Sequence, residues 1–393
     1  NAEDPFANVV ESWNIESDLS GDNYTKNDLM TSVGEAEGER LQGKVEFTMQ
    51  HRMGLAIIEM PNLVYSFTNE GLDDYFLPVN VGDFNITSGG KANKVNPYYD
   101  QATETYMILV KPNSEYSIQG TYVGVKEMTY SAKGNLLTGT AKKYTIKDES
   151  KINHTLSVGD YYCADGALVS KDVNTVPENC IGVVFYVGNS QPSVAKADKY
   201  TETQDALRRD YPSCKHGLVL ALNNAVDGDV KVNRFGSTKK LFGEWFRNNE
   251  DWKDSFVNNV TSGTIDGLMG YNNSMLMEMG IPFGENYKNA ALYAMSYTTA
   301  YRSAVATPSV TTKWYLPSIE ELKIVHEGMG VINGSLQAVS GDVLEVGTDK
   351  SGFYWATTER NTDWVWSHTM EKAVISQRNS SSYTGYFRMM LAF

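Results

Sequence analysis

Residues 314–322 are Trp-Tyr-Leu-Pro-Ser-Ile-Glu-Glu-Leu, an aromatic segment that leads directly into the start of a helix. Ser318 can accept a hydrogen bond at a helix N-terminus, and Glu321, three residues later, completes a capping box. Two further apolar blocks follow, at residues 353–359 and 388–393. The order predicts a strand, a capped helix, an aromatic strand and a terminal strand that is buried in a core.

The composition narrows the class of protein. A length of 393 residues exceeds what one hydrophobic core usually holds, so we expect two domains. A net charge of -14 disfavours nucleic-acid backbones and anionic membrane surfaces as partners. The 24 Tyr and 7 Trp outnumber the 5 His and 3 Cys, which favours contact surfaces over metal or thiol chemistry. No apolar run has the length of a membrane helix, and the sequence leaves open a cytoplasmic protein or an exported one whose targeting segment has been removed.

The pattern along the chain predicts three regions. Residues 1–40 hold ten acidic and two basic residues, which predicts an acidic, partly disordered lead-in. Residues 41–150 contain strand-length runs separated by Gly, Pro and Asn turns, which predicts an all-β sandwich. Apolar residues at every second position from Val45 to Ile57 predict one long strand within it. Residues 156–393 alternate strands with helical segments, which predicts an α+β domain.

Motifs for catalysis and for cofactors are missing from the sequence. It has no G-x-S-x-G elbow, H-E-x-x-H pair, phosphate-binding loop or dinucleotide fingerprint, and its histidines are scattered singly. We therefore expect no enzyme activity, no metal site and no cofactor. If the protein is exported, we expect its three cysteines to form one disulfide and leave one free thiol, with Cys180 and Cys214 as the preferred pair. A buried, reduced set of cysteines is the alternative.

Aromatic and polar side chains gather after residue 350. Flat rings beside carboxylate, amide and imidazole groups are typical of a surface that contacts a carbohydrate or a protein. Trp364 and Trp366 fall on one face of a strand, so they are either both buried or both displayed. The candidate binding residues are Glu359, Asn361, Trp364, Trp366, His368, Tyr383 and Tyr386.

Several segments resemble a known family. In the second region these segments are 158–162, 165–166, 180–188, 214–222, 266–267, 270–273, 314–318 and 354–359. Through them the region is similar to the C-terminal module of fimbrillin-like (Mfa-like) surface lipoproteins of Bacteroidetes. The first region resembles the fimbrillin sandwich more loosely, through residues 51–53 and 139–144. The resemblance implies a transthyretin-like sandwich followed by a C-type-lectin-like domain.

The resemblance also implies a function. It implies an exported protein at the cell surface, outer membrane or fimbrium, held to a membrane only through a lipid anchor that has been removed. Its partners are expected to be other pilin subunits, through β-strand addition, and a glycan or host protein. In related pilins a protease removes the first strand after an arginine, and Arg40 is the matching residue here. Because residues 388–393 are expected to belong to the last domain's own sheet, a tip or accessory subunit is favoured.

Two other functions stay open at this point. Lectin-like scaffolds also carry formylglycine-generating oxidases, which use a cysteine pair, so an enzyme is one alternative. Two cysteines exposed together in a cleft would favour it. A purely structural pilus subunit is the other alternative. Fold resemblance alone does not identify a ligand.

Overall fold

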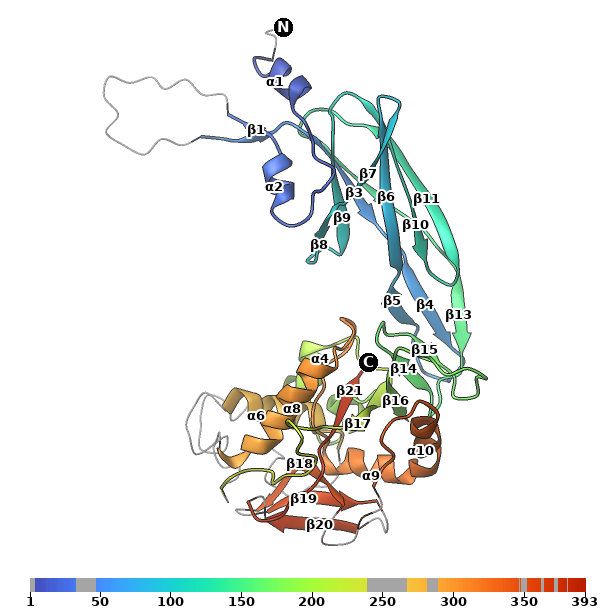
Figure 1. The fold of residues 1–393 in the computed structure, drawn as a ribbon, viewed down its shortest axis with the longest axis vertical. Helices are drawn as coiled ribbons and strands as arrows, with labels where there is room; N and C mark the ends of the chain where they lie inside the picture. Colours follow the sequence, from blue (N-terminus) through green and yellow to red (C-terminus); the bar gives the residue numbers. More distant parts are fainter. Residues whose placement is uncertain are drawn as a thin grey trace, which may run out of the picture. The chain divides into compact units, whose positions relative to one another are not determined.

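The computed structural model describes residues 4–32, 47–238, 267–280, 289–345, 347, 352–361, 364–370, 374–379 and 381–393. The chain forms two compact units, drawn in Figure 1. The first comprises residues 1–65 and 76–152, and the second comprises residues 66–75 and 153–393. The two ranges predicted from the sequence each ran without interruption. In the structure, residues 66–75 belong to the second unit although first-unit residues flank them.

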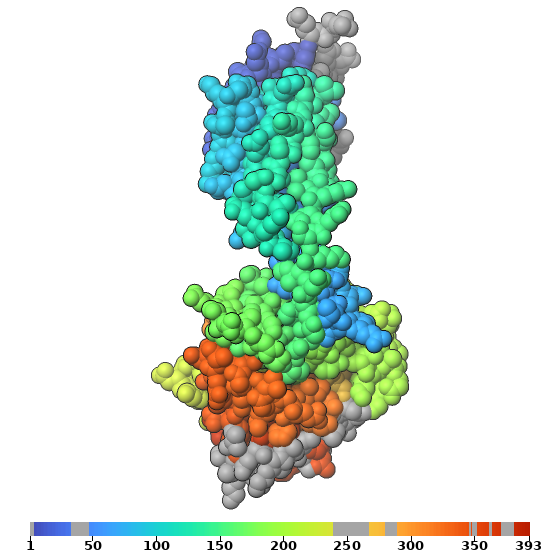
Figure 2. Space-filling model, turned by 90° about the vertical axis from the view of Figure 1, so that its right-hand side faces the viewer, coloured from blue at the N-terminus to red at the C-terminus, as the bar shows by residue number. Residues whose placement is uncertain are grey.

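The first unit is built on two four-stranded sheets. One has the order β11 (Glu127–Asn135), β10 (Glu115–Val123), β6 (Asn80–Ser88) and β7 (Lys91–Val95). The other has the order β12 (Ala141–Thr145), β3 (Gly54–Glu59), β9 (Thr105–Val110) and β8 (Tyr98–Asp100). Figure 2 shows the outer face of the first sheet, with β6 in blue and β10 and β11 in teal to green. The predicted β-rich first unit is confirmed.

The core of the first unit lies between these sheets. Burial alternates along β3, so that Ala56 and Ile58 point inward and their neighbours lie nearer the surface. They join Ile108 of β9 in one apolar cluster with Phe84 and Ile118 of the opposite sheet. Strand β12 runs parallel to β3, whereas β9 is antiparallel to both β3 and β8. The inward faces of the two sheets thus form a single core.

The long strand predicted over residues 45–57 was wrong. The chain instead forms β2 (Gln50–His51) and β3, with a break between them. Phe47 and Met49, expected on the buried face, are 67% and 50% exposed. Strand β2 pairs with β1 (Met30–Thr31), and the imidazole Nδ1 of His51 lies 2.7 Å from the Asp28 carboxylate. Pairing with a distant segment overrides the local alternation.

The expectation of a poorly ordered lead-in was also wrong, for residues 4–32. This segment, named the lead-in below, forms α1 (Ala7–Ser12), α2 (Asn23–Asn27) and β1. Val10 and Leu19 are buried in the sandwich core, and other lead-in side chains pack against it: Phe6, Trp13, Ile15, Tyr24 and Leu29. The prediction failed because it used the average composition of the segment. The few apolar residues of this acidic segment are enough to pack it against the sandwich.

The second unit is α+β, as predicted. Its main sheet has the order β15 (Leu168–Val169), β14 (Tyr161–Cys163), β16 (Cys180–Val187), β17 (Gly217–Asn224) and β21 (Arg388–Ala392). A three-stranded sheet contains β18 (Phe353–Asn361), β19 (Trp364–Thr369) and β20 (Val374–Asn379). The strands β13 (Lys151–His154), β4 (Asn62–Phe67) and β5 (Tyr75–Pro78) form another sheet, and the boundaries between the two units fall within these three strands. The helices are α3 (Pro192–Ala195), α4 (Ala206–Asp210), α6 (Gly270–Gly280), α8 (Leu292–Ala304), α9 (Ile319–Glu327), α10 (Met329–Ala338) and the 3-10 helix η1 (Glu202–Gln204).

The helix start and the terminal strand follow the prediction. The hydroxyl of Ser318 accepts a hydrogen bond from the Glu321 backbone N–H, and the Glu321 carboxylate accepts one from the Ser318 N–H at 2.6 Å. Strand β21 pairs antiparallel with β17, and Met390 also bridges to Tyr315 on its other side. Phe393 is fully buried.

Candidate functional site

A groove runs along one edge of the sandwich and is called the edge groove below. Its volume is about 410 Å³. Its lining comes from the lead-in, β6, β7 and β9 and consists of Asn14, Ile15, Glu16, Ser17, Ile86, Ser88, Asn93, Lys94, Val95, Ile108, Leu109, Val110 and Lys111. Apolar side chains from both sheets therefore meet in one depression.

The strand lengths explain why the groove is there. Strand β7 is an edge strand: within the part of the chain that the structure describes, it pairs only with β6. On the other sheet, the short β8 pairs only with residues 105–107 of β9. Residues 108–110 of β9 continue to pair with β3 on their inner side. Two backbone edges, one per sheet, thus flank the same apolar depression, which is the arrangement that accepts an added strand.

The lead-in covers this groove with few backbone hydrogen bonds. The Leu19 N–H donates to the Asn96 carbonyl at 2.8 Å, and the Asn96 N–H donates to the Ser17 carbonyl at 2.7 Å. These bonds form one isolated parallel bridge between Asp18 and Asn96, next to the end of β7. The Asn96 side-chain amide adds a bond to the Asp18 carboxylate at 2.9 Å. The lead-in therefore lies over the groove without forming a full strand in it.

Lys111 at the groove holds the end of α1. Its ammonium donates to the carbonyls of Val10 at 3.1 Å, Glu11 at 2.9 Å and Trp13. These are carbonyls that the end of a short helix leaves without intrahelical partners. Partial burial lowers the pKa of Lys111, although the nearby Glu11 opposes that shift. The Lys111 ammonium, just after β9, thus holds the lead-in in place. No sequence pattern predicted this contact, because the two segments lie far apart in the chain.

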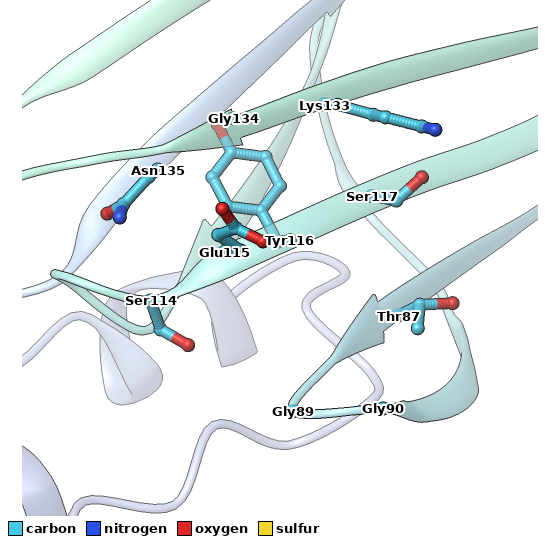
Figure 3. A pocket seen from close by; sticks show the side chains of 10 residues that line it. All are labelled: Thr87, Gly89, Gly90, Ser114, Glu115, Tyr116, Ser117, Lys133, Gly134 and Asn135. Atoms are coloured by element: carbon cyan, nitrogen blue, oxygen red, sulfur yellow. The ribbon is translucent and has the colours of Figure 1, made fainter.

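A second hollow lies at one end of the first sheet (Figure 3). Its volume is about 690 Å³, and it is lined by Thr87, Gly89, Gly90, Ser114, Glu115, Tyr116, Ser117, Lys133, Gly134 and Asn135. In Figure 3 the ammonium end of Lys133 points away from Glu115. Glu115 has no second carboxylate or histidine among these lining residues, so the hollow lacks the paired titratable groups of acid–base catalysis.

The structure divides the predicted contact residues. Glu359 and His368 are buried, which corrects their assignment to a contact surface. Trp364 and Trp366 are both partly exposed on one face of β19, and the Arg360 guanidinium lies 5.3 Å from the Trp366 ring centre. Tyr386 is half-buried, with its ring 5.6 Å from that of Tyr354, whereas Tyr383 is 40% exposed.

Asn361 ends β18, and its side chain lies outside the described residues. Arg40, the predicted processing residue, also lies outside them.

Burial shifts the pKa values of two groups in the second unit, His368 on β19 and Glu321 on α9. The rings of His368 and His326 lie 5.2 Å apart, and burial lowers the pKa of His368 to about 4, with His326 adding to the effect. His368 is therefore neutral at physiological pH. At the start of α9, burial raises the pKa of Glu321 to about 7 although the Ser318 N–H donates to its carboxylate. Both groups are packed into the core of the unit.

The predicted pairing of Cys180 with Cys214 is wrong, because the two residues lie at opposite ends of a strand pair. The structure shows all three cysteines as thiols. Strands β16 and β17 are antiparallel with Val187 opposite Gly217, so Cys180 starts β16 at the far end of this strand pair from Cys214. Cys163 and Cys214 are buried, so these two are not exposed together in a cleft, as the oxidase alternative required.

Two features are absent from the residues that the structure describes: a metal-binding cluster and a membrane-spanning helix. No group of three or more His, Cys, Asp or Glu side chains there is placed to hold a metal ion. Among those same residues, no helix is both long and apolar enough to span a bilayer.

Comparison with known proteins gives two matches. A Bacteroides ovatus protein, provisionally named fimbrium tip subunit Fim1C, is 31% identical over 420 residues, which cover all of this chain and 76% of that protein. A crystal structure of a fimbrial protein from Bacteroides ovatus superposes with a TM-score of 0.69 at 30% identity, covering 99% of this chain and 81% of the other. No family model matches the chain.

Proposed function

Because this chain belongs to the family of the Bacteroides fimbrium tip subunit Fim1C, we propose that it is a tip or accessory subunit that accepts a β-strand from a neighbouring subunit. The edge groove is the proposed acceptor site. The observation that carries this proposal is the pair of backbone edges, on β7 and on residues 108–110 of β9, that flank one apolar depression. A strand placed there gains main-chain hydrogen bonds and buries alternate apolar side chains.

Strand β21 belongs to the sheet of its own unit. Strand β21 is hydrogen-bonded to β17 on one side, and the Tyr315 and Met390 backbones exchange hydrogen bonds on the other. Every residue of β21 is buried. This strand is committed to its own sheet, so it does not serve as the donor for a neighbour.

Processing at Arg40 would link the lead-in to assembly. The lead-in covers the groove through a single bridge, the Lys111 contacts and apolar packing. Cleavage after Arg40 would leave the lead-in held by non-covalent contacts alone, which also include the pairing of β1 with β2 and the ion pair of Asp4 with Arg52. We propose that the incoming strand then displaces the lead-in, because a full strand makes more main-chain hydrogen bonds than one bridge.

The proposed ligand contact is narrower than the sequence suggested. Trp364, Trp366 and Tyr383 are at least partly exposed, so their rings can stack on a sugar or enter a pocket of a host protein. We also propose, from the family resemblance, that the second unit is C-type-lectin-like and that a lipid anchor attaches the protein to the bacterial surface before the anchor is removed.

The acceptor site can be tested by placing a charge in the groove. Ile86 lines the edge groove and is partly buried on β6. Val81 is also partly buried on this strand but does not line the groove. We expect Ile86→Lys to abolish recovery of the subunit in fimbriae sheared from cells, while Val81→Lys leaves recovery unchanged. Circular dichroism establishes that both variants fold. Normal recovery of folded Ile86→Lys would contradict the proposed acceptor site.

A further inference from the structure

Two of the three cysteines face each other across neighbouring strands. The register of β14 and β16 places Cys163 opposite Cys180, beside a β-bulge between Tyr162 and Cys163, and the two thiols are not bonded in the structure. Residues directly opposite in an antiparallel pair project their side chains from the same face of the sheet. Neither sulfur has been assigned a role in the assembly groove or in the proposed ligand contact.

The backbone hydrogen bonds identify the type of pair. The Ala164 N–H donates to the Asn179 carbonyl at 2.9 Å, which is the bond that flanks a non-hydrogen-bonded pair at 163 and 180. The Cys163 N–H points to the other side and donates to the Ala167 carbonyl at 2.9 Å. In such narrow pairs the Cα atoms are about 4.5 Å apart, within the roughly 4.4–6.8 Å range that a disulfide spans.

We infer that Cys163 and Cys180 form a cross-strand disulfide in the exported protein and that Cys214 stays a free thiol. The inference rests on the proposed function in one respect, because an exported protein meets the oxidising environment in which disulfides form. The choice of Cys163 and Cys180 as partners rests on the strand register. Cys214 is fully buried, and its thiol donates to the Val310 carbonyl at 3.5 Å. It lies beyond the end of the β16–β17 strand pair that is opposite to Cys180, so it does not compete for either partner.

The chemistry requires a disulfide donor, either a thiol–disulfide oxidoreductase or oxidised glutathione. One thiolate attacks the donor disulfide and expels a thiolate, which gives a mixed disulfide. The second cysteine loses its proton and attacks the first cysteine's sulfur, which expels the donor's other thiolate. In total, the two thiols lose two protons and two electrons, and the donor is reduced to two thiols.

The bond is expected to form during folding. Cys163 is 1% exposed in the folded protein. Burial raises the pKa of Cys163 to about 12 and that of Cys180 to about 11, so the folded, reduced pair holds little thiolate at neutral pH. In the unfolded chain both thiols have ordinary pKa values and are open to the donor. Refolding in a redox buffer is therefore the appropriate test.

The experiment uses the full chain, reduced and unfolded, then refolded with reduced and oxidised glutathione at pH 8. The product is denatured and labelled with N-ethylmaleimide, and the labels are counted by intact mass. We expect one label. Trypsin separates the cysteines into peptides 152–171, 172–196 and 210–215. We expect the first two peptides to be joined and the third to carry the label.

Variants and a cell sample give independent readouts. Cys163→Ser should raise the count to two labels, and Cys214→Ser should lower it to none. Three labels on the refolded natural chain, or a link that includes peptide 210–215, would overturn the inference without reference to either variant. The same labelling on protein sheared from cells should also give one label. If that sample gives three labels while the refolded chain gives one, the proposed surface location is wrong and the pairing stands.

Discussion

Replacing Leu19 should weaken the hold of the lead-in on the sandwich. Its side chain is fully buried in the first unit's core, and its backbone N–H donates to the Asn96 carbonyl. Leu19→Ala removes the buried side chain and leaves the backbone bond in place. It therefore isolates the apolar contribution to lead-in docking.

The magnitude follows from the loss of a buried leucine. Such replacements cost about 2–5 kcal/mol, because transfer energy is lost and a cavity is left. At about 1.4 kcal/mol for each factor of ten, the cleaved lead-in should bind roughly 30- to 4,000-fold more weakly. Changes of this kind act mostly on dissociation, so release should be faster by a similar factor.

The assay begins with the full chain, cut after Arg40 by an arginine-specific protease and checked by mass. The cleaved lead-in carries a fluorophore at its N-terminus, and its release is followed by fluorescence anisotropy on dilution. Val9→Ala is the control, since Val9 is an apolar residue of the same segment that is 44% exposed. Release from Leu19→Ala at the same rate as from Val9→Ala would refute the docking of the lead-in through the core.

Three further predictions concern the second unit. Burial raises the pKa of Glu321 to about 7, so its contribution to stability is present below the unfolded pKa near 4.5 and is lost as the pH rises through 7. In urea titrations the unfolding free energy of the natural chain should therefore fall over this pH range, and Glu321→Gln should remove about 3 kcal/mol of that fall. An unchanged fall in the variant would assign it to other groups. The buried Arg388 guanidinium donates to Asn224 Oδ1 at 3.1 Å and to the carbonyls of Leu222 and Asp342 at 2.7 and 2.9 Å. Arg388→Met should therefore lower the unfolding free energy by at least about 3 kcal/mol. A variant as stable as the natural chain would show that these bonds contribute little. Trp364→Ala and Trp366→Ala should each lower binding on a glycan array at least about tenfold, with the exposed sandwich variant Tyr99→Ala as control; equal binding by all three removes β19 from the ligand site.

Local signals in the sequence predicted the parts of the fold that depend on neighbouring residues. The capping box of Ser318 and Glu321 lies within four residues, and the structure confirms it. The buried terminal strand followed from an unbroken apolar run at the end of the sequence. Both features rest on interactions whose residue types are visible in a short window.

Features that depend on distant contacts were missed. The acidic lead-in becomes ordered because its apolar side chains find the sandwich, and Lys111 caps α1 across about a hundred residues of sequence. The position of Cys163 opposite Cys180 depends on strand register, which composition does not specify.

Glu359 and His368 suggested a contact surface because their polarity was taken as exposure. Strand β18 is covered on both faces from Phe353 to Glu359, so its residues are buried without alternation. A polar residue in such a strand has no surface to reach.

The central claim is that the edge groove receives a strand, and hydrogen exchange of intact fimbriae tests it most directly. Backbone amides of β7 and of residues 108–110 should exchange more slowly in fimbriae than in the isolated subunit, because the added strand pairs with them. The outer edge strand of the same sheet, β11, serves as the internal reference and should be unchanged. Equal exchange of β7 and residues 108–110 in both samples, with new protection elsewhere, would contradict the claim.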